Sequence, residues 1–286
     1  MKEENMFIEP MLLHSKLKPF NSSSHYFELK CNGVRMLLHR SNGKNTMYSR
    51  HKTNFSGRIP ELDDIDLDDC YLDGELVCYN EEGKEDFEAT LKRCNSSQEK
   101  TITKGSLQHK LTYIVFDILQ YRGNDLTRDP LVKRKMILTD ILQDQPSIRK
   151  CYFLETEGIL LFDKVKELDL EGIVAKSKES LYIPGIRSKD WLKIINFQIE
   201  YCYIVGYSKN KTAWLISNED YKVVGVVEFG INPSQKTAFY SISKQLKTGE
   251  NKNYIFIEPL IKCKIKHRGE QRSGALMTPI FVDFIL

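Results

Sequence analysis

Charged side chains interrupt apolar, strand-like segments at eight successive places in the first two thirds of this chain of 286 residues. An ionised group inside a buried strand is costly unless it pairs with another group or holds a ligand. One such interruption could be an accident of sequence, but eight in order predict a polar site built on the strands. The eight residues are Lys30, Arg35, Arg50, Glu75, Asp117, Glu171, Lys176 and Lys193.

The first of these charges, Lys30, stands between two apolar segments that have the character of strands. Gly33 permits a tight turn beside it, which leaves the amine at a bend where a phosphate can approach. On its own this pattern more often marks a solvated hairpin turn, since lysine and arginine commonly flank Asn-Gly. Read together with the carboxylates and the aromatic Phe116 downstream, it favours nucleotidyl transfer by an amine nucleophile.

Periodicity predicts regular elements over most of the first 196 residues. Strands are expected at 26–30, 34–40, 45–49, 71–79, 111–119 and 171–176, and helices at 86–94, 129–143 and 157–168. Residues 111–119 form a nearly continuous apolar run, typical of a strand covered on both faces, so Asp117 within it requires a partner. Asp129-Pro130 is a typical helix start.

After Asn196 the pattern changes to short alternating strands with one helix at roughly 234–247. The strands are expected at 201–207, 212–217, 223–229, 254–267 and 280–285. Five strands and one helix fit a small Greek-key barrel of the oligonucleotide-binding (OB) type. We therefore predict an α+β fold with one domain at residues 1–197 and a second at 198–286.

The second domain carries the basic excess of the chain, with 12 Lys and Arg against 8 Asp and Glu, although the net charge of the whole is only +3. Its cations include four residues spaced two apart, which places them on one face of a strand. That face is either a solvated edge defended by lysines or a surface that follows phosphates. The four residues are Lys262, Lys264, Lys266 and Arg268.

Composition excludes several classes of protein. A hydrophobic content of 41% and a charged content of 28% describe an ordinary folded chain. No run of 18 apolar residues and no leader at Met1 are present, so we expect a cytoplasmic protein with no membrane partner. The seven scattered cysteines predict neither a disulfide framework nor a zinc site. Cys31 alone is kept as a candidate reactive thiol, because it adjoins Lys30.

Six motifs in order resemble those of the covalent nucleotidyltransferases, and within them the ATP-dependent DNA ligases. Residues 28–35 resemble the nucleophile motif Lys-x-Asp-Gly-x-Arg, and residues 48–50 the Ser-Arg motif that follows it. Residues 72–77, 115–119, 171–176 and 182–193 resemble the remaining four. The resemblance covers residues 8–196 closely and the tail more loosely, and the short form is similar to the minimal ligases of bacteria and their phages.

The resemblance implies a nucleotidyltransferase (adenylation) domain of antiparallel sheets with flanking helices, followed by a small OB-fold barrel. It implies a monomer that uses ATP and Mg²⁺ (or Mn²⁺) to seal 5′-phosphate/3′-hydroxyl nicks in double-stranded DNA. Lys30 would form lysyl-AMP, AMP would pass to the 5′-phosphate, and the 3′-hydroxyl would displace it. Two alternatives stay open: an RNA ligase or capping-type nucleotidyltransferase, and a catalytically degenerate module that binds DNA ends.

Residue by residue, the resemblance assigns Glu28 and Phe116 to adenine, Phe116 by stacking, and Glu75 to the ribose hydroxyls. It assigns Glu171 to the metal, with Glu75 as a second carboxylate near it. Five cations would neutralise the triphosphate and later the 5′-phosphate, namely Arg35, Arg50, Lys176, Arg187 and Lys193. Lys193 would also help to keep Lys30 neutral and reactive. Arg50 and the four cations of the tail would contact DNA.

Three positions depart from the family pattern. Asn32 replaces an aspartate, which removes a formal negative charge beside the nucleophile. Ile195 replaces a lysine, and Met277 stands where arginine is usual, with no Arg-x-Asp following before Leu286. These changes should affect chiefly the first step, the formation of lysyl-AMP. We therefore predict slow self-adenylation with preserved sealing of nicks that are already adenylated.

Overall fold

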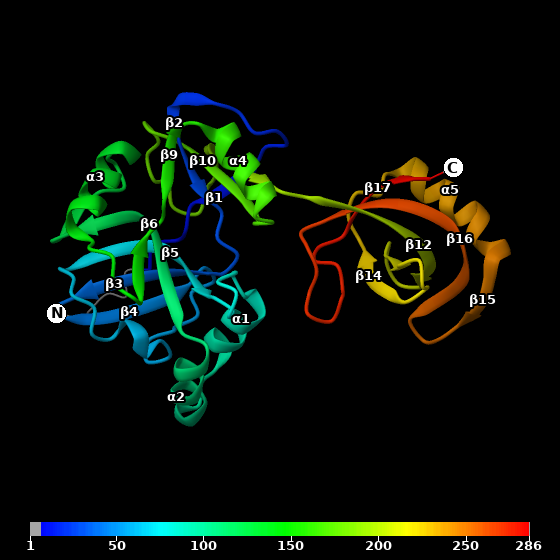
Figure 1. The fold of residues 1–286 in the computed structure, drawn as a ribbon, viewed down its shortest axis with the longest axis horizontal. Coiled ribbons are helices and arrows are strands. Elements are labelled where there is room, and N and C mark those ends of the chain that lie inside the picture. The colour runs from blue at the N-terminus through cyan, green and yellow to red at the C-terminus, as the bar shows by residue number, and fades with distance from the viewer. Residues whose placement is uncertain (1–6, 286) are drawn as a thin grey trace. The chain divides into compact units, whose positions relative to one another are not determined.

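The structure is a computed structural model that describes residues 7–285. The chain divides between Ile195 and Asn196 into two compact units, coloured blue to green and yellow to red in Figure 1. The predicted domain boundary lies two residues further along the chain.

The first unit is built on two mainly antiparallel sheets (Figure 1). In order across the first sheet lie β1 (Leu12–Ser15), β11 (Arg187–Ile195), β10 (Gly172–Ser177), β2 (Ser22–Leu29) and β9 (Phe153–Thr156). Across the second lie β4 (Lys44–Ser49), β3 (Val34–Ser41), β5 (Cys70–Cys78), β6 (Leu111–Tyr121) and β7 (Asn124–Asp125), with β8 (Ile148–Lys150) parallel to β6.

Four helices accompany these sheets: α1 (Phe87–Asn95), α2 (Glu99–Gln108), α3 (Leu131–Ile141) and α4 (Gly158–Glu167). Helix α4 packs on the first sheet by burying Leu161, Phe162 and Val165 against Phe27 and Ile173. Helices α1 and α3 contribute to the core under the second sheet. Within residues 7–285, no helix is both long enough and apolar enough to cross a membrane.

Most predicted elements of the first unit are confirmed, with ends that shift by a few residues. Helix α3 begins at Leu131 rather than before it, because Pro130 is its N-cap in an extended conformation. Seven elements of the first unit were not predicted, namely the strands β1, β7, β8, β9 and β11, the short 3₁₀ helix η1 (Pro60–Leu62) and helix α2. Helix α2 buries only Ile102, so it has no apolar stripe for sequence periodicity to detect.

The second unit is a six-stranded antiparallel sheet with one α-helix, α5 (Pro233–Ser243), and the 3₁₀ helix η2 (Lys244–Leu246). Its strands are β12 (Gln198–Ser208), β13 (Trp214–Ser217), β14 (Val223–Val227), β15 (Lys247–Glu250), β16 (Tyr254–His267) and β17 (Ile280–Phe284). They lie in the order β14-β13-β12-β16-β15, and β17 pairs with β16. Strand β15 was not predicted. Trp214, Phe239 and Phe281 pack at the centre of the hydrophobic core of the second unit.

Candidate active site

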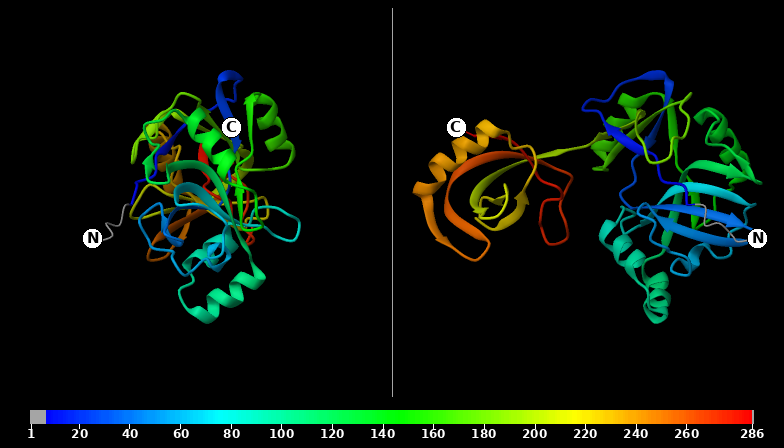
Figure 2. Two further views of the ribbon diagram at one scale, coloured as in Figure 1. Left: turned by 90° about the vertical axis from the view of Figure 1, so that its left-hand side faces the viewer. Right: turned by 180° about the vertical axis from the view of Figure 1, so that it is seen from behind.

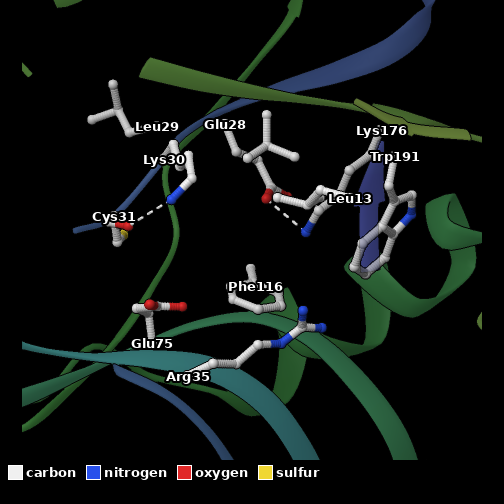
Figure 3. A pocket seen from close by; sticks show the side chains of 11 residues that line it. Leu13, Glu28, Leu29, Lys30, Cys31, Arg35, Glu75, Phe116, Lys176 and Trp191 are labelled. Carbon is white, nitrogen blue, oxygen red and sulfur yellow. Dashed lines mark hydrogen bonds and ion pairs between the residues drawn. The ribbon is translucent and has the colours of Figure 1, made fainter. Parts of the chain in front are cut away.

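A cavity of about 430 Å³ in the first unit brings together six of the ten site residues predicted there (Figure 3). They are Glu28, Lys30, Arg35, Glu75, Phe116 and Lys176, and Leu13, Leu29, Cys31, Val174 and Trp191 complete the wall. The lining comes from both sheets, because β2 and β10 face the cavity from one sheet and β3, β5 and β6 from the other. The site therefore exists only once the two sheets have come together.

Lys30 lies directly after β2, beside the start of β10. Its backbone N–H donates to the carbonyl of Gly172 at 3.0 Å, and its Nζ donates to Oε2 of Glu171 at 2.8 Å. Gly172 also lets β10 pair closely with β11, because a Cβ at that position would lie 2.3 Å from the carbonyl oxygen of Ile194. The pairing of adjacent strands thus places the predicted nucleophile against the predicted metal carboxylate.

Three more predicted cations gather near Lys30. The pKa of Lys193, on β11, is lowered first by burial and then by the positive charges of Lys30, Arg187 and Arg50. Arg187 also donates to the carbonyl of Leu13 on the neighbouring strand β1. Like charges held close together create a positive potential that attracts a polyanion such as a triphosphate.

Glu28 lies between two buried lysines at the other side of the cavity. Its Oε1 is 2.5 Å from Nζ of Lys135 and its Oε2 is 2.7 Å from Nζ of Lys176. Burial lowers the pKa of Lys176 despite the charge of Glu28, and the charge of Lys135 adds to this effect. Burial is also the largest influence on the pKa of Lys135 and acts to lower it, but the charge and hydrogen bond of Glu28, together with Cys151 and Asp117, outweigh burial and raise this pKa. The three groups carry one excess positive charge when all are ionised.

Sequence reasoning missed Lys135. It lies on α3 in the run Lys133-Arg134-Lys135, and basic residues in a helix are usually solvated. In the structure its side chain is only 5% exposed. No local signal separates it from Lys133, whose side chain is 57% exposed.

Aromatic rings surround the amine of Lys176. Its Nζ lies 4.2 Å from the ring centroids of both Phe116 and Trp191, a distance at which a cation interacts favourably with a ring face. Figure 3 shows this amine directed toward Glu28. Lys176 therefore lies against the aromatic wall of the cavity.

Arg35 is engaged by a carboxylate from the adjacent strand β5. Its Nε and Nη2 donate to the two oxygens of Asp73 at 2.9 and 2.6 Å, the bidentate geometry that arginine favours. Asp73 also accepts a hydrogen bond from the hydroxyl of Tyr182 at 2.7 Å. The guanidinium carbon lies 5.2 Å from the ring centroid of Phe116, so Arg35 supports the predicted adenine platform.

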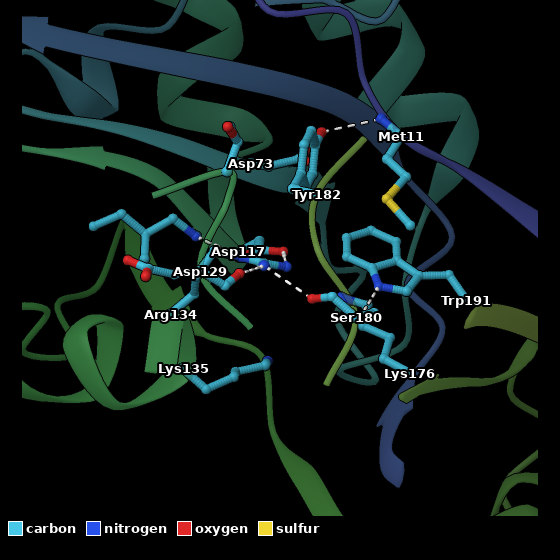
Figure 4. A network of polar contacts seen from close by, with 12 residues as sticks. Met11, Asp73, Asp117, Asp129, Arg134, Lys135, Lys176, Ser180, Tyr182 and Trp191 are labelled. Carbon is cyan, nitrogen blue, oxygen red and sulfur yellow. Dashed lines mark hydrogen bonds and ion pairs between the residues drawn. The ribbon is translucent and has the colours of Figure 1, made fainter. Parts of the chain in front are cut away.

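The partner that Asp117 requires is Arg134 on α3, which confirms the expectation that this buried carboxylate is paired (Figure 4). Nε and Nη2 of Arg134 bind the two oxygens of Asp117 at 2.8 and 2.9 Å, and both side chains are fully buried. Arg134 also donates to the carbonyl of Ser180, whose hydroxyl accepts from Nε1 of Trp191 at 3.2 Å. This network fixes the aromatic wall from behind.

Glu75, on β5, points into the cavity (Figure 3). Burial raises its pKa to about 7, although the charges of Lys30 and Arg35 act in the opposite direction. A carboxyl with this pKa changes its charge near neutral pH.

Asn32 and Cys31 complete the loop after Lys30. The backbone N–H of Asn32 donates to Oε2 of Glu85 at 2.8 Å, and burial raises the pKa of this carboxyl. Contact with Cys151 and burial raise the pKa of the Cys31 thiol well above its ordinary value. A protonated thiol is a poor nucleophile, so Cys31 does not fit the candidate role as a reactive thiol.

The predicted DNA-binding lysines lie on one face of β16 in the second unit. Lys262, Lys264 and Lys266 alternate with buried residues and lie opposite Tyr203, Tyr201 and Ile199 of β12. The amine of Lys262 is 5.4 Å from the ring centroid of Tyr203. Arg268 lies beyond the end of β16 at His267, and burial lowers its pKa, so the strand itself carries three of the four cations.

Comparison with known proteins gives consistent results. Residues 9–194 match the family described as ATP dependent DNA ligase domain. The SPbeta prophage-derived DNA ligase-like protein LigB of Bacillus subtilis is 36% identical over 277 residues, which cover 96% of this chain and 98% of that protein. The DNA ligase of Thermococcus onnurineus is 27% identical over 86% of this chain, which spans only 48% of that protein.

Solved structures show the same fold. The ligase domain of M. tuberculosis LigD matches with a TM-score of 0.60 at 19% identity, covering 97% of this chain and 95% of that one. A Lig E DNA ligase described as a minimal scaffold for DNA binding matches with a TM-score of 0.66 at 14% identity, covering 96% of this chain and 99% of that one.

Proposed function

The chain belongs to the ATP-dependent DNA ligase family, and we propose that Lys30 is the residue through which it transfers AMP from ATP to the 5′-phosphate of a nick in DNA. The observation that carries this assignment is the position of the Lys30 amine. It lies 2.8 Å from Glu171, at the cavity that Glu28 and Phe116 also line, and beside the cluster of Lys193, Arg187 and Arg50.

The reaction follows from this position. Nζ of Lys30 attacks the α-phosphorus of ATP, a nitrogen–phosphorus bond forms, and pyrophosphate leaves. Glu171 is close enough to hold the proton that the amine must lose. An oxygen of the 5′-phosphate then displaces Lys30 from AMP, and the 3′-hydroxyl finally displaces AMP. All three steps are in-line phosphoryl transfers, so positioning and neutralisation of charge supply most of the rate.

The cavity residues fit a nucleotide. Phe116 offers an aromatic ring for adenine to stack on, and the cations of Arg35 and Lys176 lie over this ring at 5.2 and 4.2 Å from its centroid. Glu28 presents carboxylate oxygens that accept hydrogen bonds from an exocyclic amine, and Glu75 presents them to ribose hydroxyls. The cations near Lys30 receive the phosphates.

The carboxylates also fit a divalent cation that arrives with the nucleotide. Mg²⁺ is commonly bound by one or two carboxylates together with water and substrate phosphates. Glu171 and Glu75 supply oxygens of that kind, whereas residues 7–285 contain no group of three or more potential ligands that could hold an ion alone. When bound, the ion would neutralise charge on the phosphate oxygens.

The second unit supplies an OB-type barrel that contacts the duplex. An isolated parallel bridge between Phe229, just after the edge strand β14, and Ile280 of β17 connects two edges of its sheet. This bridge supports the assignment of a barrel. The face of Lys262, Lys264 and Lys266 carries positive charge alongside the exposed Tyr201 and the half-buried Tyr203, a combination suited to phosphates and sugars.

Labelled ATP tests the assignment of Lys30. Wild-type protein with Mg²⁺ should become covalently labelled and should then seal a nicked duplex, whereas Lys30→Ala should do neither. Lys133→Ala, at an exposed lysine, serves as the control and should behave as wild type.

Label on Lys30→Ala, or none on folded wild type, would contradict the proposal. Labelling by GTP instead of ATP, or sealing of nicked RNA in preference to DNA, would support the RNA ligase or capping alternative.

A further inference from the structure

Residues of helices α1 and α2 line a second hollow in the first unit. Helix α1 lies against the unit and α2 extends from it (Figures 1 and 2). The hollow is open to solvent and shares no lining residue with the cavity beside Lys30. Its walls include Lys92, Ser96, Lys100, Thr101, Lys104 and Gln108, and no aspartate or glutamate lines it.

The lysines of this hollow have no counter-charge. Lys92, Lys100 and Lys104 form no ion pair within residues 7–285, and all three are exposed. Lys100 and Lys104 are four residues apart on α2, a spacing at which like charges destabilise a helix. An anionic ligand would relieve this repulsion.

The floor of the hollow is held rigidly. Nη2 of Arg93 binds both oxygens of Glu61 at 2.9 and 3.0 Å, so its charge is matched inside the protein. Gly105 lets α2 approach Arg93 closely, because a Cβ there would lie 2.9 Å from Cδ of Arg93. The two helices therefore present their lysines from a fixed base.

Helix α1 is connected to the active-site loop through Glu85. The helix begins two residues after Glu85, whose carboxylate accepts a hydrogen bond from the backbone N–H of Asn32 beside Lys30. The hollow and the cavity therefore belong to the same unit and are joined by a short stretch of chain.

We propose that the hollow between α1 and α2 binds the phosphate backbone of the duplex DNA that carries the nick. In this proposal the first unit binds DNA at the hollow as well as at the cavity beside Lys30. This inference rests on the proposed function in one respect, that the substrate is DNA.

The double substitution Lys100→Gln with Lys104→Gln tests the contact. The probe is a nicked duplex whose 3′ end lacks a hydroxyl, and its affinity is measured from low to moderate salt. Each phosphate contact contributes about 0.9 to the slope of log affinity against log salt concentration. The slope should therefore fall by about 1.8, with weaker binding at low salt. Self-adenylation should remain unchanged.

Two further variants make the result decisive. Lys164→Gln with Lys166→Gln on α4 removes the same net charge and should leave the slope at the wild-type value. Lys100→Arg with Lys104→Arg keeps the charges and should also bind as wild type. A slope for the glutamine variant equal to that of the α4 control would overturn the proposal.

The readouts separate this inference from the assignment of Lys30. Absence of Lys30-dependent label with a reduced slope would refute the catalytic proposal and support the DNA contact. Normal Lys30-dependent labelling with an unchanged slope would support the catalytic proposal and refute the DNA contact.

Discussion

Glu28, Lys135 and Lys176 form a buried cluster of one anion and two cations. Removing the anion should lower the stability of the protein more than removing one of the cations. Glu28→Gln leaves Lys135 and Lys176 both buried, at 5% and 2% exposure, with no carboxylate between them. Breaking a buried pair by deleting one partner costs about 3–5 kcal/mol, and here a single deletion strands two ammonium groups. We expect a loss of about 5 kcal/mol in the free energy of unfolding.

Lys135→Met should cost less, because Glu28 keeps Lys176 and the remaining pair is electrically balanced. The loss is that of one hydrogen bond to a charged group, about 2 kcal/mol. The double variant is the most informative case. Once Glu28 is neutral, removing Lys135 leaves only one stranded cation, so the double variant should be more stable than Glu28→Gln alone.

Urea unfolding of the nucleotide-free protein measures these differences. The Trp214→Phe background confines tryptophan fluorescence to Trp191, which is fully buried and lies 4.2 Å from the amine of Lys176. The signal then reports the first unit. The reasoning would be refuted if Lys135→Met were as costly as Glu28→Gln, or if the double variant lost the sum of the two single effects.

Three other predictions address the site directly. ATP binding should weaken about tenfold per pH unit below the Glu75 pKa of about 7. Because this folded-state pKa is raised, the same carboxyl should make the folded protein less stable as pH rises from about 4.5 to about 7. Equilibrium binding of ATP against pH checks the first effect, and Glu75→Gln should abolish it. Asn32→Asp should speed self-adenylation about tenfold if the missing charge is worth about 1.4 kcal/mol. Single-turnover labelling measures the rate of self-adenylation, and a fast, ATP-saturated burst in the wild type would contradict the prediction. Sealing of pre-adenylated nicks should be the same in both proteins. Gly172→Ala should cost about 2–3 kcal/mol, because its Cβ would meet the carbonyl of Ile194 at 2.3 Å. A melting temperature equal to that of the wild type would rule this out.

The sequence alone determined most strands and the identity of the family. Alternating apolar residues and turn signals are local, and the ordered motifs around Lys30, Glu75 and Phe116 lie at the ends or centres of those strands. Since each motif is tied to a strand, the sequence indicated which strands carry the site, and the resemblance to the ligase family implied that their side chains share it. Residues that lack such a pattern were missed, as helix α2 was, because it buries a single apolar side chain.

Only the tertiary structure decided which charges are free to meet a ligand. In the sequence, Arg35 and Asp117 were both charges within apolar strands, and nothing showed what they pair with. In the structure Arg35 binds Asp73 and Asp117 binds Arg134. Lys135 looked like a solvated helix residue and proved to be buried against Glu28. A charge pairs with whatever lies within about 4 Å in space, and that distance depends on how two sheets and a helix pack, which no local pattern encodes.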